Sequence, residues 1–253
     1  MIPNKFHFVF GLKEQTEEFH IMFYLTLKSC LEVMNPYSIN FWYDNEPYGK
    51  YWDKIKPYLN LRKIETPTEI YGKPIPHYAQ AADIVRLQVL IEEGGIYADI
   101  DTMFIKPYVK EFYSQQFVMG LEAPNQLCNA LMMSEKNAEF PKIWLSRFKD
   151  VFVGGNPGDA GWNTHSQILS TQLAREYPHL ISCLNNIPFF RYDYHQHNGI
   201  KDIYDSDIQI DSNAFSLHLW ENAAGPDRLN KLNEDYINEV DTTYNKLARR
   251  FLC

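Results

Sequence analysis

Apolar residues in the first half of the chain alternate between short runs and longer stretches with helical spacing. The short runs predict strands at residues 6–10, 38–43, 61–64 and 96–98. The longer stretches predict helices at about 17–34, with Thr16 as the cap, at 49–58 and at 77–93. Strands that alternate with helices indicate an α/β fold with a mainly parallel central sheet that is flanked by helices.

The second half of the chain continues this alternation less regularly. It predicts strands at 117–122 and 130–134, helices at 140–152 and 165–177, a loop at 153–161 and a long helix at 227–252. We find no internal repeat or linker in the sequence, so we expect one domain over residues 1–253. Ligands of such sheets bind at the carboxyl ends of the strands.

The segment 83–101, DIVRLQVLIEEGGIYADID, contains the most specific pattern in the chain. A helical apolar run stops at Gly94-Gly95, a short apolar strand follows, and Asp99 and Asp101 come next. Alternate side chains of a strand share a face, so we expect both carboxylates to point into one pocket. Two such oxygen ligands suit Mn²⁺ or Mg²⁺ bridging a diphosphate. A DxD by itself is common in acidic proteins, but its position after a helix, a Gly pair and a strand makes it specific.

The composition excludes one class of partner. Hydrophobic residues make up 45% of the 253 residues and charged residues 22%, which is ordinary for a globular protein. The net charge of −8 argues against a nucleic-acid partner, which would require a basic stripe. An acidic protein that binds a nucleotide must neutralise its phosphates locally, with a metal ion or a well-placed arginine.

The cysteines and the termini bear on the location of the protein. Its four cysteines have no zinc-binding spacing, so we interpret them as reduced thiols. The first predicted strand starts at residue 6 and leaves no room for a signal peptide, and no apolar run reaches the roughly 20 residues that span a bilayer. If the chain is complete, we expect a cytoplasmic protein. Lys246, Arg249 and Arg250 leave a peripheral membrane contact open as the alternative to a plainly packed C-terminal helix.

Three stretches, HFVFG, AADIVRLQVLIEEGGIYADID and a late HLW, resemble the glycosyltransferases with a DxD sugar-binding region. These include capsular-polysaccharide transferases, yeast-type mannosyltransferases and α-1,4-galactosyltransferases. The pattern is also similar to the catalytic core of the large clostridial glucosylating toxins. The resemblance is good over about the first hundred residues and rests on isolated motifs after them. It implies a GT-A fold, a nucleotide-sugar donor, a divalent metal ion and retention of the anomeric configuration.

The resemblance also implies a metal site. Asp101 would coordinate Mn²⁺, and Asp99 would reach the ribose or a metal-bound water. GT-A enzymes commonly take a third ligand from the C-terminal part of the chain, a role that His218 fits; the alternative is a buried core histidine. Trp220, on the same face as His218 in an extended segment, could donate its indole N–H to the leaving phosphate.

The donor sugar and base have their own candidate residues. Asp83 and Arg86 are three apart and share a helix face, and the matching pair in the family binds the hydroxyls of the donor sugar; the alternative is a local salt bridge. In the resembling pattern an aromatic residue at the position of Phe10 stacks on uracil, with core packing as the alternative. Further donor-binding candidates are Phe8 and Val9 through backbone groups, Gly11 at the end of the first strand, and Tyr97, which could equally pack in the core. Asn129 resembles a residue on the acceptor side.

We therefore interpret the chain as a metal-dependent, retaining glycosyltransferase of polysaccharide biosynthesis, with a donor-binding half at about 1–110 and an acceptor side with the C-terminal helix at about 111–253. It would transfer a hexose from a UDP-sugar, or alternatively a GDP-sugar, to a hydroxyl of a glycan or lipid-linked acceptor. Two alternatives remain: a transferase that modifies a protein side chain, and a catalytically silent protein that binds nucleotide sugars.

Overall fold

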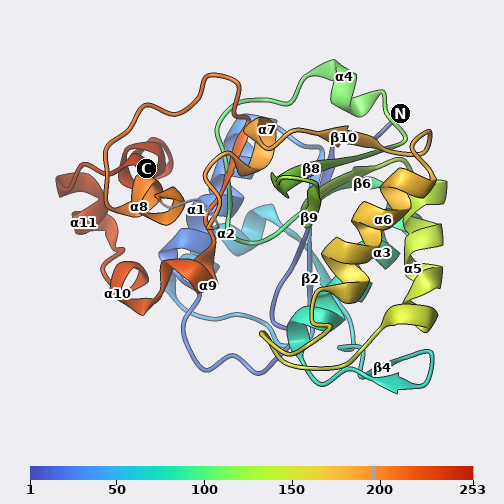
Figure 1. The fold of residues 1–253 in the computed structure, drawn as a ribbon. Helices are drawn as coiled ribbons and strands as arrows, with labels where there is room; N and C mark the ends of the chain where they lie inside the picture. The colour runs from blue at the N-terminus through green and yellow to red at the C-terminus, as the bar shows by residue number, and fades with distance from the viewer. Residues whose placement is uncertain (195–197, 253) are drawn as a thin grey trace.

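A seven-stranded sheet forms the centre of the computed structural model, which describes residues 1–194 and 198–252 (Figure 1). The strand order is β10-β8-β9-β6-β1-β2-β3. Neighbouring strands are parallel except where β9 pairs with β6 and β8. The strands are β1 (Lys5–Val9), β2 (Ser38–Tyr43), β3 (Asn60–Lys63), β6 (Gly95–Ala98), β8 (Phe117–Ala123), β9 (Gln126–Ser134) and β10 (Ser182–Leu184). This confirms the predicted α/β fold with a mainly parallel sheet.

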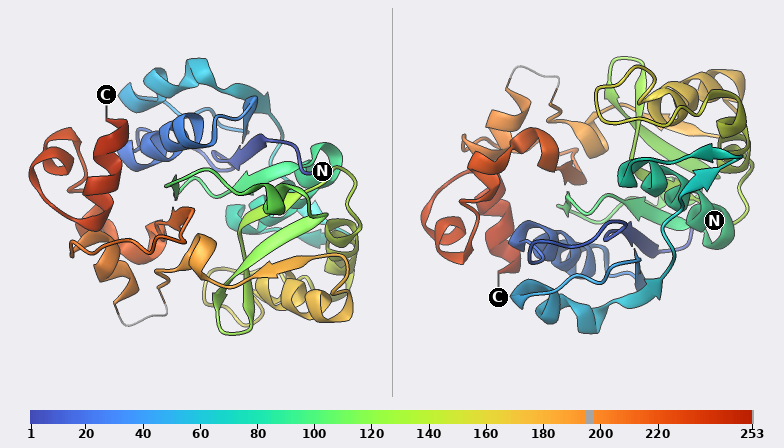
Figure 2. Two further views of the ribbon diagram at one scale, coloured as in Figure 1. Left: turned by 90° about the horizontal axis from the view of Figure 1, so that it is seen from above. Right: turned by 90° about the horizontal axis from the view of Figure 1, so that it is seen from below.

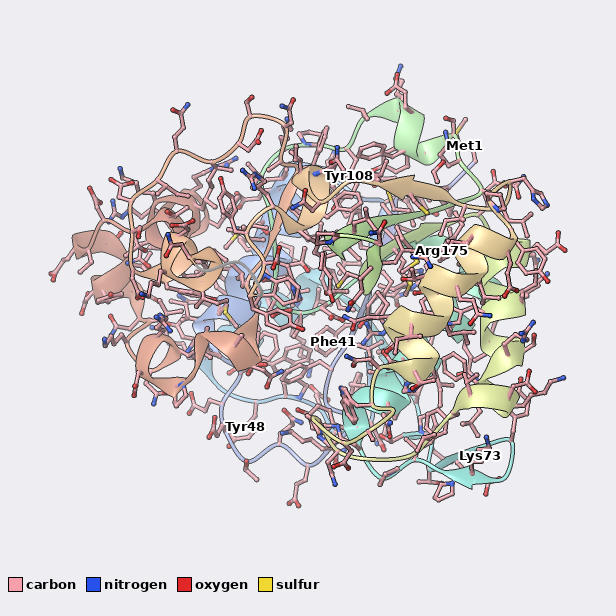
Figure 3. All side chains as sticks on the ribbon, in the orientation of Figure 1. Met1, Phe41, Tyr48, Lys73, Tyr108 and Arg175 are labelled. Atoms are coloured by element: carbon pink, nitrogen blue, oxygen red, sulfur yellow. The ribbon has the colours of Figure 1, made fainter. Side chains whose placement is uncertain are left out.

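Helices cover both faces of the sheet (Figures 1 and 2). One face packs against α3 (Tyr78–Glu93), α5 (Glu139–Val151) and α6 (Leu169–Glu176), which the π-helical turn η3 (Thr164–Ile168) precedes. The other face packs against α1 (Ile21–Ser29), α2 (Lys50–Ile55) and the C-terminal helices, which lie beside α1. Phe41 of β2 marks the second core, where its ring lies 4.9 Å from that of Trp52 in α2 (Figure 3).

The remaining elements are short. Two small antiparallel sheets pair β7 (Thr102–Phe104) with β11 (Ser216–His218), and β4 (Glu69–Ile70) with β5 (Lys73–Pro74). The other helical segments are η1 (Cys30–Met34), η2 (Lys56–Tyr58), α4 (Lys110–Tyr113), α7 (Ile187–Phe190), α8 (Gly199–Tyr204), α9 (Glu221–Ala224), α10 (Pro226–Leu229), α11 (Glu234–Glu239), α12 (Thr243–Ala248) and η4 (Arg249–Phe251).

The Gly94-Gly95 stop of α3 has a steric cause. Both residues have positive φ angles, +66° and +109°. A Cβ atom on Gly94 would lie 2.5 Å from the backbone nitrogen of Lys136, and one on Gly95 would lie 2.5 Å from the carbonyl oxygen of Lys5. The pair therefore lets the chain leave the helix and enter β6 directly between other backbone segments. At the other end of α3, His77 caps the helix by accepting a hydrogen bond from the nitrogen of Ala79.

Two sequence predictions about helices are wrong. The first helix begins at Ile21, not residue 17, because His20 rather than Thr16 caps it by accepting from the nitrogen of Met22. The predicted long helix at 227–252 is instead α10, α11, α12 and η4. Asn233 and Thr242 start two of these helices by accepting backbone N–H bonds, and such side-chain caps interrupt a helical pattern that apolar spacing alone makes look continuous.

The described residues contain no helix with the length and apolar character that crossing a bilayer requires. Cys30, Cys128 and Cys183 are free thiols, as the sequence predicts, and Cys253 lies outside the described residues.

Candidate active site

The two carboxylates of the DxD lie on a turn between β6 and β7. The nitrogen of Thr102 donates to the carbonyl of Asp99 at 3.1 Å, which closes the turn. The predicted strand ends at residue 98, as β6 does, and the two carboxylates converge as expected, but a turn rather than the alternation of a strand brings them together. Asp101 is held from the C-terminal part of the chain: its carbonyl accepts from the nitrogen of Leu219, and its Oδ2 accepts from the nitrogen of Glu221.

His218 reaches this turn because β11 pairs antiparallel with β7, which places His218 opposite Thr102. Its Nε2 lies 3.0 Å from Asp101 Oδ1 and 3.9 Å from Asp99 Oδ2. One ligand atom from each of Asp99, Asp101 and His218 lies within 4.8 Å of the others. The structure thus brings together the three residues that the sequence nominates as metal ligands, and we call this group the candidate metal site.

The electrostatics of the candidate metal site follow from burial and close charges. Burial raises the pKa of Asp99; Arg86 opposes this effect and Asp101 adds to it, so the pKa stays raised. Burial also raises the pKa of Asp101, but His218 outweighs it and the net pKa is lowered. Burial lowers the pKa of His218, but Asp101 and Asp99 reverse this, and the net pKa is raised. Asp101 is therefore the more readily ionised of the two carboxylates.

The donor set fits a divalent cation. Nδ1 of the buried His218 has no hydrogen-bond partner among the described residues, and its Nε2 faces carboxylate oxygens of Asp101 and Asp99. A buried polar atom without a partner is costly, and a metal ligand bond would satisfy it. Two carboxylates and one imidazole match a divalent ion with mixed oxygen and nitrogen ligands.

Arg86 of α3 links Asp83, its partner in the predicted sugar-binding pair, to the DxD. Its Nη1 lies 3.3 Å from Asp99 Oδ1, and its Nη2 lies 3.4 Å from Asp83 Oδ1. Its Nε donates to the carbonyl of Ala82, and its Nη1 also donates to the carbonyl of Asn129. With 7% of its side chain exposed, Arg86 bridges two carboxylates and two carbonyls inside the protein.

Tyr97 supports the same arrangement from β6. Its hydroxyl donates to Asp99 Oδ1 at 2.5 Å, and its ring lies 4.6 Å beneath the guanidinium of Arg86. Burial raises the pKa of Tyr97 well above its ordinary value, so the hydroxyl keeps its proton and remains a donor. Tyr97 is therefore both a core residue and a contact of the DxD.

Asp83 has two further partners. Asn129 Nδ2 lies 2.7 Å from Asp83 Oδ1 and donates to it, and His165 Nε2 lies 2.9 Å from Asp83 Oδ2. The sequence nominated Asn129 from a short match and gave no role to His165. No spacing rule could reveal a residue 82 positions away from Asp83 that folding alone brings close.

The end of β1 carries the predicted nucleotide contacts. Phe10 is partly buried, and its ring packs against Phe19 at 5.4 Å and Phe23 at 5.2 Å. Phe8 and Val9 have buried side chains, which leaves their backbone groups as the candidates for contact. Gly11 has a φ of +71°, and a Cβ there would lie 2.2 Å from the carbonyl oxygen of Asn45, so only glycine fits.

A cavity of about 260 Å³ opens beside this strand end. Its lining includes Leu12 and Lys13 after β1, Thr66 and Thr68 after β3, and His77 and Tyr78 at the start of α3. The ring of His77 stacks on Tyr78, and Lys13 Nζ lies 4.5 Å from the centre of the Tyr78 ring. These lining residues were missed, although the rule that ligands bind at the carboxyl ends of strands points to this region.

Trp220 lies beside His218, with ring centres 4.0 Å apart. Its indole N–H donates to the carbonyl of Tyr192 at 2.8 Å. In this conformation the proton that the sequence assigned to a leaving phosphate is used inside the protein. A phosphate would have to compete with that carbonyl.

Comparison with known proteins agrees with this geometry. Residues 22–119 match the family described as "Glycosyltransferase sugar-binding region containing DXD motif". "Glucan organizing enzyme 1" from Cryptococcus neoformans var. grubii serotype A is 34% identical over 270 residues, which cover 100% of this chain and 71% of that protein. "Subversion of eukaryotic traffic protein A" from Legionella pneumophila is 35% identical over 65 residues, covering 24% of this chain and 10% of that protein.

The fold has solved counterparts as well. The apo form of the glycosyltransferase GlyE from Streptococcus pneumoniae TIGR4 superposes with a TM-score of 0.54 at 11% identity, covering 98% of this chain and 60% of that one. The chain thus spans little more than half of GlyE, and the likeness confirms the GT-A-like fold alone. The family match over residues 22–119 and the match of the Cryptococcus protein across the whole of this chain show that it belongs to the family of glycosyltransferases with a DXD-containing sugar-binding region.

Proposed function

We propose that the chain is a metal-dependent, retaining glycosyltransferase that transfers a hexose from a UDP-sugar to a hydroxyl of a glycan or lipid-linked acceptor. The observation that carries this proposal is the meeting of Asp99, Asp101 and His218 next to the Arg86–Asp83 pair. A cation site and a carboxylate–guanidinium pair side by side offer one contact for a diphosphate and one for a polyol.

Asp99, Asp101 and His218 would hold the metal, with Mn²⁺ or Mg²⁺ as the ion. When bound, the cation would supply Lewis-acid stabilisation of the charge on the diphosphate leaving group. Asp83 would accept hydrogen bonds from hydroxyls of the donor sugar, and Arg86 would fix the distance between Asp83 and Asp99. Trp220 would contact the phosphate by donating its indole N–H to it in place of the carbonyl of Tyr192.

The nucleoside of the donor would occupy the cavity at the ends of β1 and β3. Lys13 supports this placement because it lines the cavity and its positive charge also lowers the pKa of Glu221. The backbone nitrogen of Glu221 donates to Asp101 in the candidate metal site. Burial raises the pKa of Glu221, Asp101 raises it further, and Lys13 lowers it, so Lys13 and Asp101 both lie within electrostatic reach of one carboxylate. We propose that Phe10 stacks on the base, with Phe8, Val9 and Gly11 beside it and Tyr97 near the sugar. A GDP-sugar is the alternative donor.

For the acceptor we propose only a chemical class. The name of the Cryptococcus relative refers to glucan, which supports a glycan acceptor. The Legionella relative covers only 24% of this chain and lends little support to modification of a protein side chain. We place the donor-binding half at about 1–110 and the acceptor side at about 111–253 of a single domain. We also propose a cytoplasmic location, which the free thiols of Cys30 and Cys128 support.

A panel of UDP- and GDP-sugars with Mn²⁺, read by nucleotide release, tests the proposal. Release that requires both the metal and one donor is the expected result. Binding of nucleotide sugars without any turnover would instead favour a catalytically silent binding protein. Proton NMR of the first product, read at the anomeric coupling constant, tests retention: an α-linked donor should give an α-linked product.

A further inference from the structure

We infer that His165 is a positioning residue that orients the carboxylate of Asp83 toward the donor sugar. The inference rests on the proposed function, because it assigns Asp83 a substrate contact. It concerns a residue that no motif identifies and that folding delivers from the far side of the 153–161 loop.

His165 is held rigidly. Its side chain is completely buried on the π-helical turn η3. Its ring packs against two neighbouring aromatic side chains, 5.1 Å from Phe148 and 4.8 Å from Phe152. The backbone carbonyl of His165 accepts a hydrogen bond from Trp144 Nε1 at 2.7 Å. A fully buried ring that packs against two aromatic side chains and is also held through its backbone can impose a direction on its one polar contact.

Counting donors and acceptors shows which ring nitrogen of His165 carries the proton in its contact with Asp83. Burial raises the pKa of Asp83, but Arg86, His165 and Asn129 outweigh it, and the net pKa is lowered; Asp83 is therefore ionised and can only accept. Nδ1 of His165 has no hydrogen-bond partner within the part of the chain that the structure describes. Nε2, 2.9 Å from Asp83 Oδ2, must therefore carry the proton and donate.

The two oxygens of Asp83 are thus fixed by different segments. Asn129 of β9 holds Oδ1, and His165 of η3 holds Oδ2. A carboxylate bound at one oxygen only can still rotate about its χ2 torsion, which is broad for aspartate. The second bond removes that freedom and leaves the unused lone pairs pointing in a set direction. Misplacing a substrate contact by about 1 Å can cost roughly 100-fold in rate.

Two variants separate hydrogen bonding from packing. His165→Leu keeps an apolar side chain of similar volume against Phe148 and Phe152 but removes the donor. His165→Gln keeps an N–H donor at a similar reach. We expect His165→Leu to lower kcat for donor turnover by roughly 100-fold with UDP affinity unchanged, and His165→Gln to recover most of the lost rate. Equal losses in both variants, or a loss of UDP affinity that parallels the rate, would indicate a merely structural histidine and overturn the inference.

A double-mutant cycle provides the second readout. If His165 acts only through Asp83, His165→Leu should cost little further rate in an Asp83→Asn background, because the orientation of a changed group no longer matters. Additive losses would overturn the inference. Melting temperatures and UDP titrations of all four proteins show whether each one is folded and binds UDP, so that their rates can be compared. If the wild-type protein binds no nucleotide sugar, the proposed function and this inference both fail; if it turns a donor over and the cycle is additive, only the inference fails.

Discussion

Arg86 Nη1 lies 3.3 Å from Asp99 Oδ1, and this contact ties the long helix α3 to the turn that carries the DxD. Four protein oxygens surround the guanidinium, from Asp99, Asp83, Asn129 and Ala82. A planar fork of five donors can serve all of them at once, whereas an ammonium group is a single compact point charge. The helix spacing that pairs Asp83 with Arg86 thereby also sets the position of the first aspartate of the DxD.

Arg86→Lys should therefore reduce the transfer rate far more than UDP affinity. Lysine keeps the positive charge but cannot hold both carboxylates and both carbonyls in place. UDP titration and transfer rate, measured on one preparation, provide the comparison. Arg147→Lys is the matched control, because Arg147 forms an exposed pair with Asp150 on α5 and should tolerate the change. A near-normal transfer rate in Arg86→Lys would refute the bridging role.

Asp101→Ala should abolish metal-dependent donor turnover without unfolding the protein. The carboxylate is a proposed ligand, and the variant also loses its bond from the nitrogen of Glu221 and its contact with His218 Nε2. Asp101→Asn is the sharper form of the test, because an amide oxygen can still accept from Glu221 but lacks the negative charge that a divalent ion needs. Calorimetric titration of Mn²⁺ in the presence of UDP measures the loss. Unchanged turnover in either folded variant would remove Asp101 from the metal site.

His218→Ala should weaken metal affinity by roughly 10–100-fold or more, since losses of groups that merely support ligands already reach that range. The variant removes a buried imidazole whose Nδ1 has no hydrogen-bond partner in the described residues and whose Nε2 lies 3.0 Å from Asp101 Oδ1. We expect metal binding to suffer more than folding, because the polar contact of this ring is made to a proposed metal ligand. The Mn²⁺ dependence of the rate is the measurement, and an unaltered dependence would make His218 a core histidine.

Phe10→Ala tests stacking against packing. If the ring stacks on the base, UDP affinity should fall by about 1–3 kcal/mol. The structure also packs the ring against Phe19 and Phe23, so we expect a loss of folding stability as well, below the roughly 3–5 kcal/mol of a fully buried phenylalanine. Chemical denaturation and UDP titration separate the two effects. A large drop in stability with intact UDP affinity would show that Phe10 only packs.

The sequence predicts those parts of the site whose residues lie close together in the chain. Gly94-Gly95, the DxD and the Asp83–Arg86 spacing all lie in one segment, and local sterics or helix periodicity determine each. His218 was reached through the family pattern alone. The contact of His165 with Asp83 depends on how η3 packs against β9 and α5, and no local pattern encodes that packing.

The helix errors have a similar cause. Apolar spacing at 227–252 describes which face is buried, but Asn233 and Thr242 decide where each helix begins by bonding to backbone groups. The alternation of side chains in a strand predicts the convergence of Asp99 and Asp101, whereas the bond from the nitrogen of Thr102 to the carbonyl of Asp99 closes a turn there. In both cases backbone hydrogen bonding overrides a correct pattern of burial.

His7 makes the stability of the fold depend on pH. Its Nε2 lies 2.9 Å from the carbonyl of Gly94, and its Nδ1 accepts from Trp42 Nε1, so the neutral ring joins β1 and β2 to the Gly stop of α3. Burial lowers the pKa of His7 from 6.5 to about 4, against the raising effect of the Gly94 carbonyl. The unfolded chain therefore binds more protons than the native state between these two values, and stability rises with pH across that window.

The expected result is that the contribution of His7 to the free energy of unfolding is complete above pH 6.5 and falls by about 3 kcal/mol as the pH drops to about 4. Burial also lowers the pKa of His20, so the wild-type curve alone cannot isolate His7. The difference between wild-type protein and His7→Gln can, because glutamine does not titrate while it still offers a donor and an acceptor. Urea unfolding at several pH values measures both curves. If the two curves remain parallel between pH 4 and 6.5, burial does not lower the pKa of His7. The contact between His7 and the carbonyl of Gly94 must then tolerate a charged ring.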